Sequence, residues 1–117
     1  MTANTFQEEC FELANIVRRH FDANPLQGDS YRFGRNEIIG WISDHLDGVK
    51  KAIKTGFMFG HRETRYTTHY DRNRDRRLMD VHVQQILVLL PKILGSHLKF
   101  ECLRLDDWEF VISIKWP

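Results

Sequence analysis

Hydrophobic residues recur with helical spacing near the start of the chain. Five of them fall at intervals of four, three, four and four residues, which places them on one face of a helix. Thr5 and Glu8 have the spacing of a capping box, in which each side chain satisfies a free amide at a helix start. The pattern predicts a helix over residues 6–23, ended by Pro25. Its apolar face consists of Phe6, Cys10, Leu13, Val17 and Phe21.

A second amphipathic pattern follows a polar stretch. Residues 25–36 are rich in Gly, Asn, Asp and Ser, which is typical of a loop with at most a short edge strand. Beyond them, apolar residues again recur every three or four positions, with three lysines in the last turns. We therefore expect a second helix that is closed by Gly56. Its apolar positions are Ile38, Ile42, Leu46, Val49 and Ile53.

Residues 75–94 predict a third helix. The run from Ile86 to Leu90 is apolar on every side, so this half of the helix is expected in the centre of the core. Pro91 is expected to kink or end the helix, because proline lacks the amide hydrogen that the helical ladder needs.

The last part of the chain alternates between apolar and polar residues, as one strand of a β-hairpin does. A two-residue turn would place charged side chains of the preceding strand on the same face as Ile112. A three-residue loop over residues 105–107 places Phe100 and Cys102 on that face instead, so it is the favoured loop. The apolar positions of the last strand are Trp108, Phe110, Ile112, Ile114 and Trp116.

Residues 62–70 contain threonines and tyrosines that suit a strand, so this segment is expected to be either a third strand or a long ordered loop. The order of elements predicts an α+β fold, with three helices packed on a small antiparallel sheet that includes a C-terminal β-hairpin. No internal repeat or low-complexity tract divides the chain. We expect residues 1–117 to form a single globular domain.

The composition is 42% hydrophobic and 28% charged, which is typical of folded proteins and not of disordered chains. The longest apolar run is too short to cross a bilayer, and the acidic start of the chain does not have the layout of a secretion signal. The two cysteines, Cys10 and Cys102, have apolar neighbours, so we expect buried thiols and not a disulfide. These features predict a cytoplasmic protein without membrane association.

Positive charge is concentrated in the middle of the chain. Residues 1–49 carry four basic and eight acidic residues, residues 50–77 carry nine and three, and residues 78–117 carry four and five. The basic segment, defined as residues 61–77, contains six arginines, two histidines and two tyrosines. Arginine forks suit carboxylate and phosphate, and tyrosine rings offer stacking surfaces. The candidate binding residues are Arg62, Arg65, Tyr66, Tyr70, Arg72, Arg74, Arg76 and Arg77.

No catalytic motif accompanies this segment. The chain lacks the usual patterns of phosphate loops, dinucleotide sites, zinc proteases and serine hydrolases. Its six histidines are scattered without paired-ligand spacing, so no metal and no cofactor is expected. Glu63, Arg65 and His69 would share one face of a strand and offer the acid, base and phosphate contact of a metal-independent ribonuclease. Because no spacing singles these residues out, catalysis is the least favoured hypothesis.

The pattern favours a non-enzymatic protein-binding domain of the inhibitor, immunity or anti-defence type. In this interpretation the basic segment contacts a partner protein with an acidic surface. The alternative is a nucleic-acid-binding protein that holds RNA or single-stranded DNA with the same segment. A third interpretation is a solvated surface in which the acidic residues of the segment pair with its arginines. If the segment takes no part in binding, Tyr31, Phe33 and Trp116 are the next candidates for an exposed aromatic surface.

Overall fold

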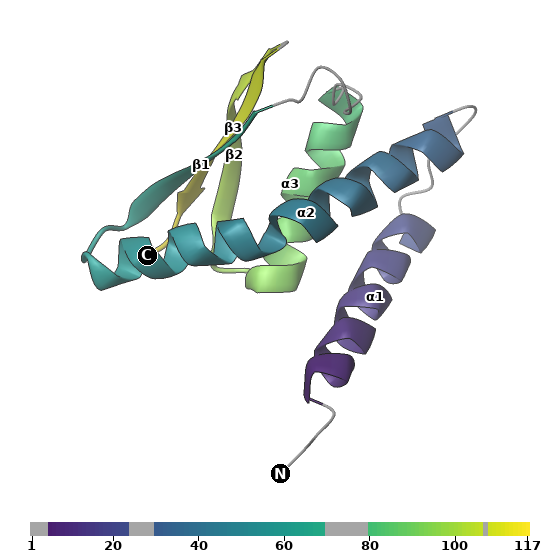
Figure 1. The fold of residues 1–117 in the computed structure, drawn as a ribbon, viewed down its shortest axis with the longest axis horizontal. Helices are drawn as coiled ribbons and strands as arrows, with labels where there is room; N and C mark the ends of the chain where they lie inside the picture. The colour runs from purple at the N-terminus through teal and green to yellow at the C-terminus, as the bar shows by residue number, and fades with distance from the viewer. Residues whose placement is uncertain (1–4, 24–29, 70–79, 107) are drawn as a thin grey trace.

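A computed structural model describes residues 5–23, 30–69, 80–106 and 108–117. These residues form three helices and a three-stranded antiparallel sheet (Figure 1), so the predicted α+β class with its C-terminal hairpin is confirmed. The predicted helical residues 75–79 lie outside the described part of the chain. The elements are α1 (Thr5–Ala23), α2 (Ser30–Met58), β1 (Glu63–His69), α3 (Asp80–Leu94), β2 (Lys99–Leu105) and β3 (Glu109–Lys115).

The sheet has β3 in the middle, with β1 and β2 on either side of it. Of the two predictions for residues 62–70, the strand is correct, because β1 pairs with β3 along its whole length. Helix α2 lies against β1 and α3 lies against β2, both on one face of the sheet (Figure 1). The alternate residues of β1 are exposed on the other face. The sheet therefore has a covered face and an open face.

The hairpin buries Phe110, Ile112 and Ile114 on one face, as predicted, but its loop lies one residue further along the chain. Phe100 lies opposite Ile114, on the covered side. Leu105 belongs to β2 and pairs with Phe110, so the predicted loop over residues 105–107 is wrong in position, and residues 106–108 connect the strands. A β-bulge directly after Cys102 shifts the register, and this shift keeps Leu105 on the same face as Phe100.

Asp106 stabilises the turn between β2 and β3. Its carboxylate oxygen Oδ1 accepts hydrogen bonds from the backbone amides of Trp108, at 2.8 Å, and Glu109, at 2.9 Å. The amide of Asp106 in turn donates to the carbonyl of Glu109 at 3.1 Å. One side chain thus satisfies the amides that a tighter turn would have paired within the backbone.

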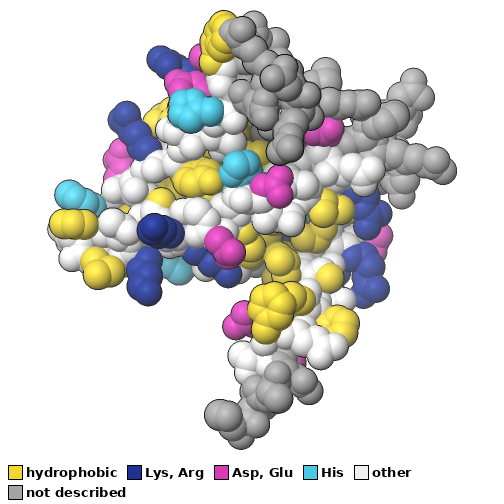
Figure 2. All heavy atoms as spheres, in the orientation of Figure 1, with side chains coloured by type: hydrophobic (Ala, Val, Ile, Leu, Met, Phe, Trp, Pro, Cys, Tyr) yellow, Lys and Arg dark blue, Asp and Glu magenta, His cyan; other side chains and the backbone are white. Residues whose placement is uncertain are grey.

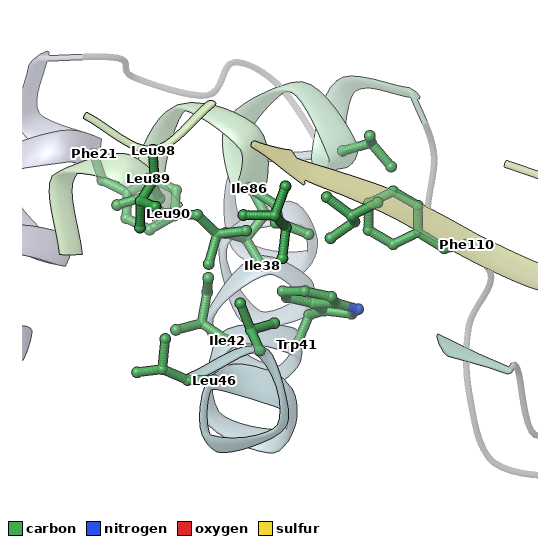
Figure 3. Packing of buried hydrophobic residues seen from close by; sticks show 14 of the residues in the cluster. Phe21, Ile38, Trp41, Ile42, Leu46, Ile86, Leu89, Leu90, Leu98 and Phe110 are labelled. Atoms are coloured by element: carbon green, nitrogen blue, oxygen red, sulfur yellow. The ribbon is translucent and has the colours of Figure 1, made fainter. Parts of the chain in front are cut away.

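The hydrophobic core lies between the helices and the covered face of the sheet (Figure 3). Val88 of α3 is nevertheless 45% exposed, so the prediction that this half of α3 is surrounded by the core is wrong for one side of the helix. The completely buried hydrophobic side chains are Ile38, Val49, Ile86, Leu89, Leu90, Phe110, Ile112 and Ile114.

Helix α2 begins earlier than predicted. Residues 30–36 are helical, although their polar composition predicted a loop; residues 25–29 of that predicted loop lie outside the described chain. Extending a helix costs little once part of it is fixed. The buried Ile38 and Trp41 fix the next turns, so packing outweighs the weak local propensity.

Neither Gly56 nor Pro91 ends its helix. Helix α2 passes Gly56 and runs to Met58. Gly56 serves close packing and not capping, since a Cβ there would lie 2.7 Å from the ring of Trp116. Pro91 does not end α3, which continues to Leu94.

Helix α1 is buried only in its second half. Residues 5–12 are all exposed, whereas His20 and Phe21 are buried. Cys10 is therefore exposed, and so is Cys102 on the edge strand β2. The prediction of two buried thiols is wrong, because both cysteines lie at the margins of the fold, one on the projecting half of α1 and one at a sheet edge.

A partly buried polar cluster attaches α1 to α3. Nδ1 of His20 lies 3.2 Å from Nζ of Lys92, and Nε2 makes a hydrogen bond with Oε1 of Gln85. Because a lysine ammonium can only donate, Nδ1 accepts and Nε2 carries the proton. Burial lowers the pKa of His20, the Gln85 hydrogen bond partly opposes this, and Lys92 lowers it further. His20 is therefore a neutral link at physiological pH.

We expect Ile112→Ala to lower the free energy of unfolding by about 2–4 kcal/mol, because the completely buried side chain would leave a cavity. Val88→Ala is the matched control, and it should change stability by less than about 0.5 kcal/mol because Val88 is partly exposed. Urea denaturation followed by circular dichroism measures both. Equal losses in the two variants would contradict the assignment of the covered face.

The stability of the fold should fall as the pH decreases from 7 to 5. The unfolded chain protonates His20 near its ordinary pKa of 6.5, whereas the folded chain resists protonation until a lower pH. The contribution of His20 to stability is therefore fully present above pH 6.5. It is lost as the pH falls through the pKa that His20 has in the folded chain. The His20→Gln variant should lose less stability over this pH range. Part of the loss should remain, because burial also lowers the pKa of His82. Denaturation curves at pH 7.5 and 5.5 test this, and identical losses with and without His20 would refute it.

Candidate functional site

Three of the eight predicted binding residues lie in the described structure. Arg62 is in the turn that leads into β1, and Arg65 and Tyr66 are in β1 itself. The described portion of the basic segment is residues 61–69. The other five predicted residues lie outside the described part of the chain; they are Tyr70, Arg72, Arg74, Arg76 and Arg77.

The pleat of β1 separates the predicted arginine from the predicted tyrosine. Arg65 lies on the open face and is exposed, whereas Tyr66 lies on the covered face, as does the buried Thr68. The structure therefore does not bring Arg65 and Tyr66 to one surface. It does place Glu63, Arg65 and His69 on one exposed face of the strand, which is the arrangement considered for a ribonuclease.

Tyr66 is packed against α2. Its hydroxyl oxygen lies 2.9 Å from Nδ1 of His45, and the ring of Trp41 meets it edge-on at a centroid distance of 6.3 Å. Gly48 leaves room for the ring, since a Cβ there would lie 2.7 Å from the hydroxyl oxygen. Burial raises the pKa of Tyr66, so the phenol stays protonated at neutral pH. The side chain of Tyr66 thus packs β1 against α2.

The open face of the sheet carries both signs of charge. Arg65 lies opposite Ser113, which lies opposite Glu101 on the far strand. In the next row, Glu63 lies opposite Lys115, which lies opposite Lys99 on the far strand. Acidic residues therefore lie among the basic ones on this face, and a pair of opposite charge such as Glu63 and Lys115 stabilises a sheet modestly. The open face is therefore not a uniformly basic surface.

Glu109 contacts two side chains, Arg104 and His69, at one end of this face. Its Oε1 accepts a hydrogen bond from Nη1 of Arg104 at 2.7 Å, and its Oε2 lies 3.7 Å from Nδ1 of His69. Asp106 lies 3.9 Å from the same arginine. The side chains of His69 and Arg104 are largely exposed, so these pairs add little stability, but they neutralise the charge of Arg104.

Three consecutive large apolar side chains are exposed where α2 ends. Phe57 is 52% exposed, Met58 is 78% exposed and Phe59 is 74% exposed. They form what we call the apolar tip. Figure 2 shows hydrophobic side chains at this end of α2, at the left of the view, with a histidine beside them. The ring of His61 lies 6.2 Å from that of Phe59 and nearly parallel to it.

A helix-capping motif fixes the backbone of the apolar tip. The amide of Gly60 donates to the carbonyl of Phe57 at 3.0 Å, and the amide of His61 donates to the carbonyl of Gly56 at 2.9 Å. Gly60 has φ of +76°, the left-handed conformation that this pair of hydrogen bonds requires. The tip is therefore a defined turn, held by the same bonds that end the helix.

Trp116 packs against Phe57 of the apolar tip, on the side that faces the fold. Its ring stacks on Phe57 with a centroid distance of 4.5 Å, and its amide donates to the carbonyl of Arg62 at 3.1 Å. The side chain is buried, so the hypothesis of Trp116 as an exposed aromatic is wrong. The side chains of the other two candidates, Tyr31 and Phe33, lie outside the described part of the structure.

Sequence reasoning missed the apolar tip. The apolar stripe of α2 continues in steps of four from Val49 to Ile53 and Phe57, so Met58 and Phe59 fall beside the stripe and away from the core. The sequence thus contained a signal for an exposed hydrophobic helix end, namely an apolar pair outside the stripe that is followed by Gly60.

Neither a metal centre nor a membrane span was found in the described residues. Within residues 5–23, 30–69, 80–106 and 108–117, no three His, Cys, Asp or Glu side chains gather to hold a metal ion. No helix in the same ranges is both long enough and apolar enough to cross a bilayer. Comparison of the chain with protein-family models, with curated proteins and with solved structures finds no match.

Two glycine substitutions should have opposite effects. Gly60→Ala should lower the free energy of unfolding by about 1–2 kcal/mol, because alanine resists the left-handed backbone of the cap. Gly40→Ala should raise it by about 0.5–1 kcal/mol, because Gly40 is in the interior of α2 with no atom near the added Cβ. Thermal unfolding of both variants decides the matter. A neutral Gly60→Ala would show that the tip is not held by this cap.

Proposed function

We propose that this protein is a non-enzymatic protein-binding domain, which acts by covering a surface of its partner as inhibitors and immunity-type proteins do. The observation that carries the proposal is the apolar tip. Exposed apolar side chains that adjoin one another mark interaction surfaces more often than scattered ones do. Phenylalanine, methionine and arginine are enriched in the cores of protein interfaces.

Basic residues surround the apolar tip. Arg62 is three residues after Phe59 in the chain and is exposed. Lys54 is exposed one helical turn before Met58, and Lys51 is exposed one turn earlier. This arrangement, an apolar centre with a positive rim, fits a partner protein that offers a hydrophobic pocket bordered by carboxylates. Arg62 links the tip to the basic segment, so both belong to one binding surface in this proposal.

The nucleic-acid alternative has weaker support. Proteins that bind single strands combine a basic groove with exposed aromatic rings on which bases stack. Tyr66 lies on the covered face, and the described residues of the open face include acidic side chains between the basic ones. RNA binding is therefore kept as an outcome that the experiment must distinguish.

The test is capture of the partner from a lysate of the native host at moderate salt, with and without nuclease. Met58→Ser combined with Phe59→Ser should abolish capture of a protein that survives nuclease, because it removes the hydrophobic anchor. Arg62→Glu combined with Lys54→Glu should mainly slow association, since rim charges act on the encounter rate. Both double variants should keep the melting temperature, because the substituted side chains are exposed or partly exposed.

Leu103→Ser is the matched control, because Leu103 is a similarly exposed apolar residue at the opposite edge of the sheet. It should leave capture unchanged. If the tip variant retains the same partner, the apolar tip is not the binding surface. If nuclease removes everything that the protein captures, the nucleic-acid alternative replaces the proposal.

A further inference from the structure

Helix α1 is attached to the rest of the fold near its C-terminal end. Its buried residues are His20 and Phe21, and its N-terminal end points away from the other elements (Figure 1). Apart from Phe21, the buried hydrophobic residues of the described chain lie between Ile38 and Trp116. The described core is therefore built almost entirely from α2, α3 and the sheet, and these elements can stay packed when α1 moves away.

The attachment of α1 depends on the neutral form of His20. This side chain is 2% exposed, and its ring offers one acceptor and one donor. Nδ1 accepts a hydrogen bond from Nζ of Lys92 at 3.2 Å, and Nε2 donates to Oε1 of Gln85. A protonated ring carries a hydrogen on both nitrogens, so Nδ1 would face an ammonium group that also donates. Protonation therefore removes the bond to Lys92 and brings two positive charges together.

The charged groups of α2 and α3 that pack around this end of α1 are both cationic. Lys92 comes from α3, and Arg35 of α2 places its guanidinium carbon 5.1 Å from the centre of the Phe21 ring. That ring meets His20 edge-on at a centroid distance of 5.3 Å. On α1 itself, the side chains three and four positions from His20 are uncharged, and the exposed Asp22 is two positions away, which is not a facing position on a helix.

We propose that protonation of His20 releases α1 from α3, while α2, α3 and the sheet keep their packing. Lys92 is exposed and can turn towards solvent, but the imidazolium would still be buried in place, and burial disfavours a charged ring. When α1 is released, the ring of His20 enters water, where both of its hydrogens find acceptors. Acid therefore favours the released state.

The pH range follows from the two environments of His20. Burial and the charge of Lys92 hold its pKa below the ordinary value of 6.5 in the attached helix, and the Gln85 hydrogen bond opposes this only in part. In the released helix the ordinary value applies. The attachment is thus at full strength above pH 6.5. It weakens by up to about tenfold for each pH unit below 6.5, until the pH reaches the pKa of the attached ring.

Release of α1 uncovers an apolar surface. Leu46 of α2 and Ile93 of α3 line the groove beside α1, opposite Leu13 of α1, and they are uncovered when the helix leaves. A helix of 19 residues is marginal in water without packing, so α1 also loses part of its helical structure. The apolar tip at the end of α2 stays in place, so this inference does not depend on the proposed function.

Hydrogen exchange of the intact chain, followed by mass spectrometry, tests the proposal. Protection of the amides is measured for residues 16–22 of α1 and for β3 at pH 7.5 and 5.5, with correction for the intrinsic pH dependence of exchange. Protection of residues 16–22 should fall by several-fold, up to about tenfold, at the lower pH. It should be lower than the protection of β3 at both values, with a weaker dependence on urea, because release exposes less surface than complete unfolding does.

Two variants separate protonation of His20 from other effects of acid. His20→Gln keeps a donor and an acceptor but does not titrate, so protection of α1 should be equal at the two pH values. Gln85→Glu places a carboxylate beside Nε2, where it pairs with the protonated ring, so the fall should disappear or reverse. His97→Gln is the matched control, because it removes an exposed histidine near β2, and it should keep the fall seen in the wild type.

Three results would overturn the proposal. The first is a fall of less than about twofold in the wild type. The second is a fall as large as that of the wild type in whichever of the variants His20→Gln and Gln85→Glu folds. The third is exchange of α1 with the same protection and the same urea dependence as β3, since α1 would then open only when the whole chain unfolds.

Discussion

Burial of one face of β3 is the constraint on which the rest of this fold depends. Phe110, Ile112 and Ile114 are completely buried, and each contributes on the order of 1.5–3 kcal/mol through the apolar area removed from water. The strand pairs with β1 on one side and β2 on the other, while α2 and α3 cover it. Among the described residues β1 and β2 each pair with β3 alone, so the sheet does not form without β3. The sheet and the two helices that cover it should therefore form cooperatively.

The sequence predicted the elements wherever periodicity and burial agree. The covered face of β3 and the buried positions of α2 follow directly from the alternation and the helical spacing of apolar residues. The early start of α2 was missed because composition is a weak guide when the following turns, at Ile38 and Trp41, are fixed by packing. Cys10 shows the reverse error. An apolar stripe states which face of a helix is suited to burial, but it does not state whether another element reaches that face.

The residues of the candidate site could likewise be listed from the sequence, but the faces on which they lie could not. A positive segment was visible in the composition, but the pleat of β1 divides its residues 63–69 between two faces, and this division depends on the strand being formed. Tyr66 could not be assigned to the covered face until α2, with Gly48 and His45, was seen beside it. The apolar tip was hidden for a physical reason, since hydrophobic residues are expected to be buried unless the path of the chain carries them outward. Here Gly60 turns the chain immediately after Phe59 and leaves that ring outside.

Because Trp116 stacks on Phe57, the fluorescence of this tryptophan reports on the apolar tip. Indole emission depends on the polarity around the ring, and Trp116 is buried directly behind Phe57. Any ligand that covers or displaces Phe57 changes the surroundings of that indole without touching it. Trp41 lies in the core and Trp108 lies in the hairpin turn, so their emission is set by other parts of the fold. With those two tryptophans replaced by phenylalanine, the intrinsic fluorescence of the chain would report occupancy of this surface alone, with no attached dye.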